Sequence, residues 1–553
     1  MITSLPGNLK LLTPNRLIII LLFCACSSPA DTTQITGSVA SAHPLATKAG
    51  LDILASGGNA FDAAIAVAST LNIVEPMMSG IGGYGTILIY DANNKQVRYL
   101  NPSGRFPVKT NTDLMRAPTV DYKKNRVGPK SISTPGNLNA WEDMHKKYGK
   151  LAWAELFTDA INFAENGYFI SHNTARWIEL AFNDFSKYSQ SFYGNNGNPL
   201  KDGDKLVQAD LANTYKLIAA EGAAPFYSGS LAKAIDKQMQ VAGSFLSIED
   251  LQNNSAEWWN PIKFNYKGYE VYTAGLPANS FPAFVNLGLM EQFSKDTMQH
   301  NSVKYLHRFA EMTKQSYKAR LAYSYDPEIK KSPLDSILAD DFLATMAAAL
   351  DKEQASEFVP PFLPESRNTT HFVVVDKWGN IVSATQTLGN LFGSRIMVEG
   401  TGIWLNNSMA YSTFEPKGNP MDAFPGRHKL SGDCPVIILK DGIPWAALGS
   451  PGGHTITQNV PQIIFNLIDF EMSMQEAIDA PKIAFAEPDR IIIDRDMPQE
   501  VVDLLANKGH NVISRNIGNA NGIKIVYDEN GVIQRLDVGI DKRGEGRAAI
   551  VDH

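Results

Sequence analysis

Cysteine is scarce in this sequence of 553 residues, which contains only three. Cys24 and Cys26 lie near the N-terminus, so Cys434 is the one cysteine in the rest of the chain. A disulfide framework within the body of the protein is therefore excluded. Cys434 precedes Pro435 and the apolar run 436–439, so we expect a buried structural thiol rather than a nucleophile.

The chain also lacks an excess of positive charge, because 50 basic and 57 acidic residues give a formal net charge of −7. This balance argues against a nucleic-acid-binding surface. There is no repeat of fixed period, no low-complexity tract and no HExxH zinc motif. His300 and His307 have no acidic partner at metal-ligand spacing, so we expect them to pack or face solvent, and we expect no metal or other cofactor.

The N-terminal segment departs from the ordinary globular composition of the remainder. Lys10 and Arg16 precede the apolar run 17–23, which predicts a secretory signal peptide over residues 1–26 that is too short to span a bilayer. Ala25-Cys26-Ser27-Ser28 also resembles a bacterial lipoprotein cleavage site, which would attach a lipid at Cys26. We expect export to the periplasm or cell envelope, with lipid attachment left open.

Mixed helices and strands are predicted for the body of the chain. A strand over 37–43 leads into an alanine-rich helix from Pro44, and Asn59 caps a second helix. Segment 134–350 is mainly helical, with a strand pair near 262–273 and amphipathic stretches near 151–165, 205–221, 281–295 and 301–323. Gly80, Gly82 and Gly85 match GxGxxG by letter, but they follow a helix and lead into a strand, which excludes a nucleotide site.

Asn368-Thr369-Thr370-His371 opens a predicted strand that turns at 376–380 into a second strand. If the chain is cut before Thr369, this residue gains a free α-amine beside its own hydroxyl. An α-amine with a pKa of roughly 7.7–8.0 can take the hydroxyl proton near neutral pH. The alternative is that the threonines only open a buried strand, where threonine is common.

Gly449-Ser450-Pro451-Gly452-Gly453-His454 connects a predicted strand to a helix that begins near Thr457. Consecutive glycines at such a turn can present backbone N–H groups to an oxyanion, or can form a tight turn with positive φ. Ser450 does not fit the GxSxG elbow. In the loop 101–107, Arg105 could anchor an anionic substrate group or could be a solvated arginine.

These separated motifs together resemble the γ-glutamyltranspeptidase family of N-terminal-nucleophile hydrolases. The matching segments, in order along essentially the whole mature chain, are 40–47, 57–64, 79–85, 369–371, 405–407 and 449–453. The resemblance implies an α+β fold, a four-layer αββα sandwich with a mainly helical elaboration in the heavy chain. It also implies one precursor that gives a heavy chain, 27–368, and a light chain, 369–553, paired as a heterodimer.

The resemblance further implies catalytic roles. Thr369 would be the nucleophile in self-cleavage and in turnover, and Thr387 would hydrogen-bond to it and activate it. Gly452 and Gly453 would donate backbone N–H groups to the oxyanion. The reaction would be acyl transfer from an amide, through an acyl-enzyme, to water or an amine.

The substrate-binding residues depart from the family pattern. Ser103 stands where typical members have an arginine that grips a carboxylate, with Arg105 two residues away. Ser408 and Tyr411 replace the groups that bind an α-amine. The other candidate substrate-binding residues are Asn390 (beside Gly389, which replaces an asparagine), Asn407, Ser431 and Gly432, the last replacing a serine.

Three hypotheses follow. The first is a self-processing γ-glutamyl hydrolase or transferase acting on glutathione-like donors. The second keeps this chemistry for a glutaryl-type amide, as in the related cephalosporin acylases, or for a γ-linked polymer; Ser103, Tyr411 and Gly432 favour it. The third is a secreted binding protein without turnover, which has no chemical need for Thr369 and Thr387.

Overall fold

The computed structural model describes residues 35–293, 298–358, 368–486 and 489–552. The signal peptide expected over 1–26, with its candidate lipidation residue Cys26, lies outside these ranges. Among the described residues, none of the helices combines the length and apolar character needed to cross a membrane.

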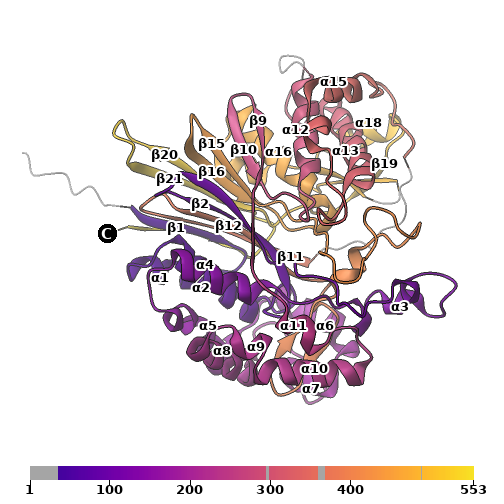
Figure 1. Ribbon diagram of the computed structural model, residues 1–553. Coiled ribbons are helices and arrows are strands. Elements are labelled where there is room, and N and C mark those ends of the chain that lie inside the picture. The colour runs from indigo at the N-terminus through magenta and orange to yellow at the C-terminus, as the bar shows by residue number, and fades with distance from the viewer. Residues whose placement is uncertain (1–34, 294–297, 359–367, 487–488, 553) are drawn as a thin grey trace, which may run out of the picture. The chain divides into compact units, whose positions relative to one another are not determined.

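Two antiparallel sheets form the centre of the fold (Figure 1). One has the strand order β22-β1-β11-β12-β2-β3-β8 and the other β21-β20-β16-β15-β10-β9. An apolar layer that includes Leu88, Val373, Ile437 and Ile523 lies between them. The first sheet comprises β1 (Ile35–Ser41), β2 (Tyr84–Asp91), β3 (Gln96–Asn101), β8 (Glu257–Trp259), β11 (Asn368–Asp376), β12 (Ile381–Gly389) and β22 (Arg547–Asp552). The second comprises β9 (Ile262–Tyr266), β10 (Tyr269–Thr273), β15 (Val436–Lys440), β16 (Ile443–Gly449), β20 (Asn521–Tyr527) and β21 (Ile533–Ile540).

Helices cover the outer side of each sheet, as Figure 1 shows. The seven-stranded sheet packs against α1 (Pro44–Ala55), α2 (Ala60–Val74), α4 (Asn137–Tyr148), α5 (Thr158–Asn166) and α8 (Ala209–Glu221). The six-stranded sheet packs against α12 (Phe281–Glu291), α16 (Ile456–Ile468) and α17 (Met474–Asp479). Outside them, α13 (Val303–Tyr323) and α15 (Asp340–Ala348) pack on α12, and α18 (Gln499–Asn507) packs on α13. The predicted αββα sandwich is confirmed, and α5, α8, α12 and α13 coincide with the predicted amphipathic stretches.

The first two helices begin where the sequence predicts. Pro44 is the first residue of α1, and the side chain of Asn59 accepts the backbone N–H groups of Phe61 and Asp62. The Asp62 carboxylate accepts the N–H of Asn59 in return, at 3.1 Å, which completes a capping box. Small alanine side chains let α2 approach the sheet closely, and all 15 of its residues are buried.

Asp376 holds the turn between β11 and β12. Its carboxylate accepts the N–H groups of Trp378 and Asn380 at 2.9 and 3.0 Å, and the side-chain amide of Asn380 at 2.8 Å. It also accepts the N–H of Ala60 at 2.9 Å, at the N-terminus of α2. One fully buried carboxylate thus connects the central hairpin to the outer helical layer.

We expect the substitution Asp376→Ala to lower the free energy of unfolding by about 3 kcal/mol, because it leaves several buried N–H donors unpaired. The measurement is the urea unfolding midpoint. Asp528→Ala is the matched control, since Asp528 accepts the N–H groups of Asn530 and Val532 in a surface hairpin. Equal losses in both variants would contradict a special role for the buried connection.

Candidate active site

Thr369 lies at a bulge in the pairing of β11 with β12. Asn368 pairs with Gly389 and Thr370 with Gln386, so that Thr387 and Leu388 together oppose Thr369. The Thr387 hydroxyl donates to the carbonyl oxygen of Asn368 at 2.6 Å and accepts the N–H of Gly389 at 2.9 Å. The bulge therefore aims a hydroxyl donor at the carbonyl that Thr369 would attack in self-cleavage.

His371 has a structural position between the two sheets. It is fully buried, and its Nδ1 lies 2.9 Å from the hydroxyl of Thr385. Burial lowers the pKa of His371 to about 3, so the ring is neutral. Its ring packs on Gly449, where a Cβ atom would lie 2.3 Å from the imidazole. A glycine at the end of β16 is therefore required for the glycine loop 449–453 to leave the sheet at this point.

The glycine loop reaches the pocket of Thr369 from the six-stranded sheet. Gly452 and Gly453 have φ values of 135° and 60°, which a side chain would oppose. They stand at the start of the short helix η7 (Gly453–Thr455), which continues directly into α16. A helix N-terminus favours negative charge, which suits the oxyanion of an acyl-transfer reaction.

Glu75 lies close to Thr369. Its carboxylate accepts the hydroxyl of Thr370 at 2.8 Å, and both Glu75 and Thr369 line the same pocket. Burial raises the pKa of Glu75 to about 7. Sequence reasoning passed over Glu75, although it stands directly before the glycine-rich segment 79–85.

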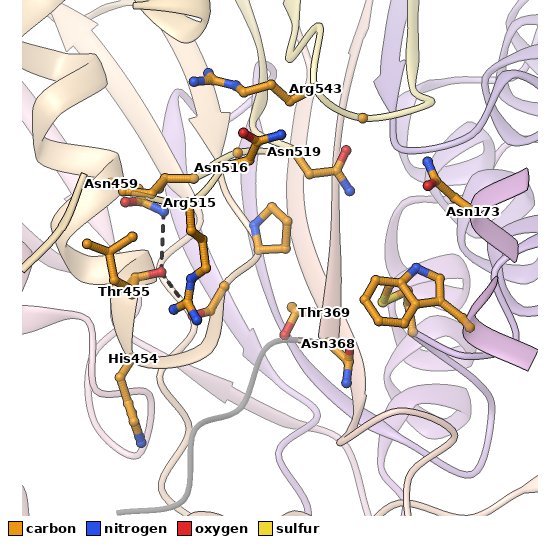
Figure 2. Close-up of a pocket in the computed structure, with 18 of the residues that line it drawn as sticks. Asn173, Asn368, Thr369, His454, Thr455, Asn459, Arg515, Asn516, Asn519 and Arg543 are labelled. Carbon is orange, nitrogen blue, oxygen red and sulfur yellow. Dashed lines mark hydrogen bonds between the residues drawn. The ribbon is translucent and has the colours of Figure 1, made fainter. Parts of the chain in front are cut away.

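Thr369 lines two pockets at once. The larger, of about 530 Å³, contains Asn368, Pro451 and Gly452 as well. Figure 2 shows Thr369 in this pocket, with His454 and Thr455 on one side and Asn173 on the other. The narrower pocket contains Thr387, Tyr411, Gly432 and Gly453. A bound amide could therefore place its acyl part in one pocket and its amine part in the other, with its carbonyl at Thr369.

The narrow pocket also contains residues that sequence reasoning missed. They are Tyr84, Arg320, Lys429, Leu430, Asp433 and His454. Burial lowers the pKa of His454 well below its ordinary value, so its ring is neutral. Lys429, Asp433 and His454 lie beside or within segments that the sequence analysis selects. Their positions in the sequence could therefore have identified them as candidate pocket residues. Arg320 stands in the predicted helix 301–323, where nothing in the sequence marks it as buried.

Four other predicted residues do not line this pocket: Asn390, Asn407, Ser408 and Ser431. The Tyr411 hydroxyl donates to Asn390 Oδ1 at 2.9 Å, and Asn407 Oδ1 accepts the N–H of Asn390 at 2.8 Å. Ser408 and Ser431 are buried, and the Ser408 hydroxyl has no hydrogen-bond partner among the described residues. These contacts fix the strand end and the loop that carry Tyr411.

Ser103 and Arg105 lie apart from Thr369. The Ser103 hydroxyl donates to Asn101 Oδ1 at 2.6 Å. Arg105 lines a different pocket, and its guanidinium donates to Glu257 at 2.9 Å and to Glu328 at 2.8 Å. The hydrogen bond from Arg105 helps to lower the pKa of Glu328 to about 2. Its guanidinium is therefore already neutralised by two carboxylates.

Cys434 is fully buried, as predicted. Burial raises the pKa of its thiol to about 12, and the sulfur lies 3.5 Å from the hydroxyl of Thr273. A thiol that remains protonated is a poor nucleophile, so its structural assignment is consistent with its surroundings.

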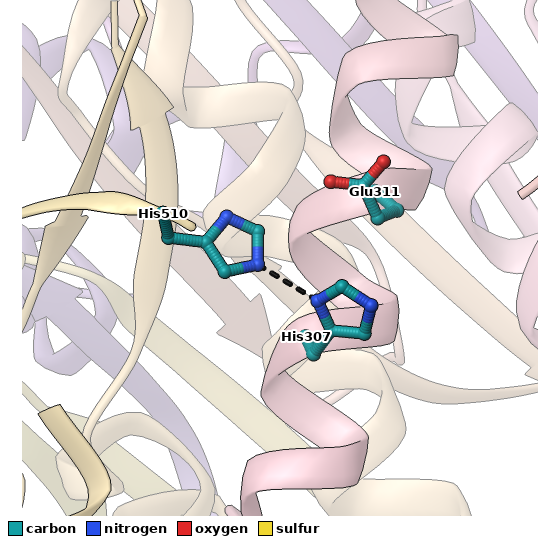
Figure 3. A group of neighbouring side chains, drawn as sticks. All are labelled: His307, Glu311 and His510. Atoms are coloured by element: carbon teal, nitrogen blue, oxygen red, sulfur yellow. Dashed lines mark hydrogen bonds between the residues drawn. The ribbon is translucent and has the colours of Figure 1, made fainter. Parts of the chain in front are cut away.

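His307, Glu311 and His510 form a buried cluster away from Thr369 (Figure 3). The expectation that His307 lacks an acidic partner is wrong, because Glu311 stands one turn further along α13. His307 Nδ1 lies 2.8 Å from His510 Nε2. However, the Glu311 carboxylate already accepts the Lys314 ammonium at 2.7 Å. We therefore interpret the cluster as a paired polar network rather than a metal centre.

Comparisons with known proteins agree with this geometry. A family model described as gamma-glutamyltranspeptidase matches residues 46–551. The glutathione hydrolase proenzyme of Bacillus subtilis strain 168 is 32% identical over 524 residues, which cover 90% of this chain and 89% of the relative. The acylase ACY 1 proenzyme of Pseudomonas sp. strain SE83 is 33% identical over 504 residues, covering 89% of each.

The chain is also similar in structure to solved proteins of this kind. The cephalosporin acylase from Bacillus halodurans superposes with a TM-score of 0.85 at 27% identity, covering 96% of this chain and 99% of that one. The Helicobacter pylori γ-glutamyltranspeptidase has a TM-score of 0.55 at 30% identity, covering 60% of this chain and 95% of that one. The sandwich is thus of the N-terminal-nucleophile hydrolase type.

We expect Thr387→Val to slow cleavage of the Asn368–Thr369 bond by about 10²–10³-fold, because it removes a donor to the attacked carbonyl. The measurement is the time course of the two chains by intact mass. Thr385→Val is the control, since Thr385 lies on β12 with Thr387 but its hydroxyl contacts His371 instead of the Asn368 carbonyl. Cleavage at the wild-type rate in Thr387→Val would contradict this role.

A pH dependence follows from Glu75. Because its pKa is raised to about 7 in the folded protein, the folded state binds the extra proton and stability falls as pH rises from about 4.5 through 7. Glu75→Gln should remove this part of the dependence, so that its Tm falls less between pH 5 and 8. Glu142→Gln, which changes a carboxylate that accepts the N–H of Ala223, should keep the wild-type slope.

Proposed function

Because this chain belongs to the γ-glutamyltranspeptidase family, we propose that it is a precursor that cuts itself before Thr369 and then transfers acyl groups from amides. The observation that carries this proposal is the 2.6 Å hydrogen bond from Thr387 to the Asn368 carbonyl. The bond polarises the carbonyl that the neighbouring hydroxyl must attack.

Self-cleavage begins when Thr369 Oγ1 attacks the carbonyl carbon of Asn368. The C–N bond breaks, the Thr369 nitrogen takes a proton, and Asn368 is left as an ester on Thr369. Water then hydrolyses the ester, which leaves a carboxylate on Asn368 and a free α-amine on Thr369. The products are a heavy chain, 27–368, and a light chain, 369–553, which stay paired.

Turnover reuses the same hydroxyl. The free α-amine takes the Thr369 hydroxyl proton as the oxygen attacks the substrate carbonyl. Backbone N–H groups of Gly452 and Gly453 stabilise the oxyanion. The substrate amine leaves with the proton, and an acyl ester remains on Thr369. Water or a second amine then attacks the ester and releases the acyl group.

The difference in size between the two pockets favours a substrate with a small acyl group and a larger amine part. The narrow pocket contains Thr387, Tyr411 and Gly453, whereas the cavity that also reaches Thr369 has a volume of about 530 Å³. We propose γ-glutamyl amides such as glutathione as donors, in keeping with the names of the glutathione hydrolase relatives. The second candidate is a glutaryl-type amide, favoured because Arg105 is paired with carboxylates away from Thr369.

Export is proposed from the sequence pattern of residues 1–26. The enzyme would then act in the periplasm or cell envelope. Lipid attachment at Cys26 would hold it at a membrane surface, while ordinary signal cleavage would release it.

The deciding variant is Thr369→Ala, which we expect to remain a single uncut chain with no amidase activity. Wild-type protein should give two chains whose masses place the cut before Thr369, and should hydrolyse γ-glutamyl or glutaryl p-nitroanilide. Thr370→Ala is the matched control, since it removes the neighbouring hydroxyl and should still be cut. A wild-type chain that stays whole and is inert to both anilides would leave the binding-protein hypothesis standing.

A further inference from the structure

Lys429 is a buried cation beside the nucleophile. Its side chain lines the narrow pocket together with Thr369, Thr387 and Gly453, and the residue is 2% exposed. Its ammonium lies 4.1 Å from the ring centre of Tyr84 and 5.3 Å from that of Tyr411. Within the described ranges the ammonium forms no hydrogen bond and no ion pair within 4.0 Å. Its nearest favourable contacts are the cation–π contacts with these two rings.

The charges around Lys429 do not balance. The described residues of this pocket include two cationic side chains, Lys429 and Arg320, but a single carboxylate, Asp433. Asp433 also accepts the hydroxyl of Thr86 at 3.0 Å. Arg320 is 5% exposed, and its Nε has no hydrogen-bond partner among the described residues. One buried positive charge is therefore left uncompensated.

A buried charge without an opposite charge nearby raises the free energy of the folded protein, and binding of an anion lowers it again. Burial lowers the pKa of Lys429 to about 7 and that of Arg320 to about 10, and the charge of Asp433 only partly offsets this effect at Lys429. An incoming carboxylate would balance the charge and accept the unused N–H donors. The pocket thus has the chemistry of an anion-binding site.

We propose that Lys429, assisted by Arg320, binds the terminal carboxylate of the acyl donor. This inference rests on the proposed acyl transfer at Thr369. A glutaryl group carries its carboxylate three methylene groups from the reacting carbonyl, and a γ-glutamyl group carries it at the same distance with an added ammonium. The glutaryl monoanion neutralises the pocket, whereas the γ-glutamyl zwitterion leaves its excess positive charge in place. The preferred donor is therefore a dicarboxylic half-amide without an α-amine.

The test compares glutaryl, γ-glutamyl and pentanoyl p-nitroanilides on processed protein. Pentanoyl has the chain length of glutaryl without its carboxylate. Wild type should prefer glutaryl over both others. In Lys429→Met, kcat/KM for glutaryl should fall by about 10- to 100-fold, mainly through KM, because one charged contact is lost. Hydrolysis of the pentanoyl anilide should be unchanged, and Lys429→Arg should recover part of the glutaryl activity.

Lys440→Met is the matched control, because this exposed lysine also lies over an aromatic ring, that of Tyr269 at 5.1 Å. It should behave as wild type on every anilide. Two chains by intact mass show that each variant has folded and been cut. Equal losses on glutaryl and pentanoyl anilides, or no loss on glutaryl, would overturn the role of Lys429. A wild type that is neither cut nor active would instead overturn the proposed function itself.

Discussion

The pairing of β11 with β12 is the constraint on which the rest of the structure depends. Its bulge places Thr369 opposite Thr387 and brings the Thr387 hydroxyl to 2.6 Å from the Asn368 carbonyl. Its turn is fixed by Asp376, which also holds the start of α2. Because β11 lies inside the sheet, any shift of its register would move Thr369 away from both pockets.

Burial determines which titratable side chains near Thr369 carry a charge. His371 and His454 are neutral because neither can be hydrated, and so neither competes with the α-amine of Thr369 as the base in the proposed mechanism. Arg105 keeps its charge among carboxylates, whereas Lys429 is desolvated without a close carboxylate. The cation of Arg105 is thus paired with carboxylates away from the pockets of Thr369, whereas Lys429 lines a pocket together with Thr369.

The sequence predicts the elements whose signals are local. The proline that begins α1, the Asn59 cap and the glycine loop each follow from a few neighbouring residues, and all lie where expected. The narrow pocket could not be predicted in the same way. Arg320 reaches it from α13, and Tyr84 from β2, so only the packing of the two sheets brings them to Lys429. The pairing of Arg105 could not be predicted either, because its partners Glu257 and Glu328 are far away in sequence.

The order of strands has a consequence for the molecule after it is cut. Strands β1, β2, β3 and β8 precede Thr369, yet they share a sheet with β11, β12 and β22, and β1 lies between β11 and β22. Likewise, β10 pairs with β15 in the other sheet. Unfolding before the cut is a unimolecular event, whereas recovery of the cut protein requires two separate chains to meet. Dilution would therefore oppose refolding of the mature enzyme. After self-cleavage, a molecule that unfolds and separates into its two chains does not readily regain its fold.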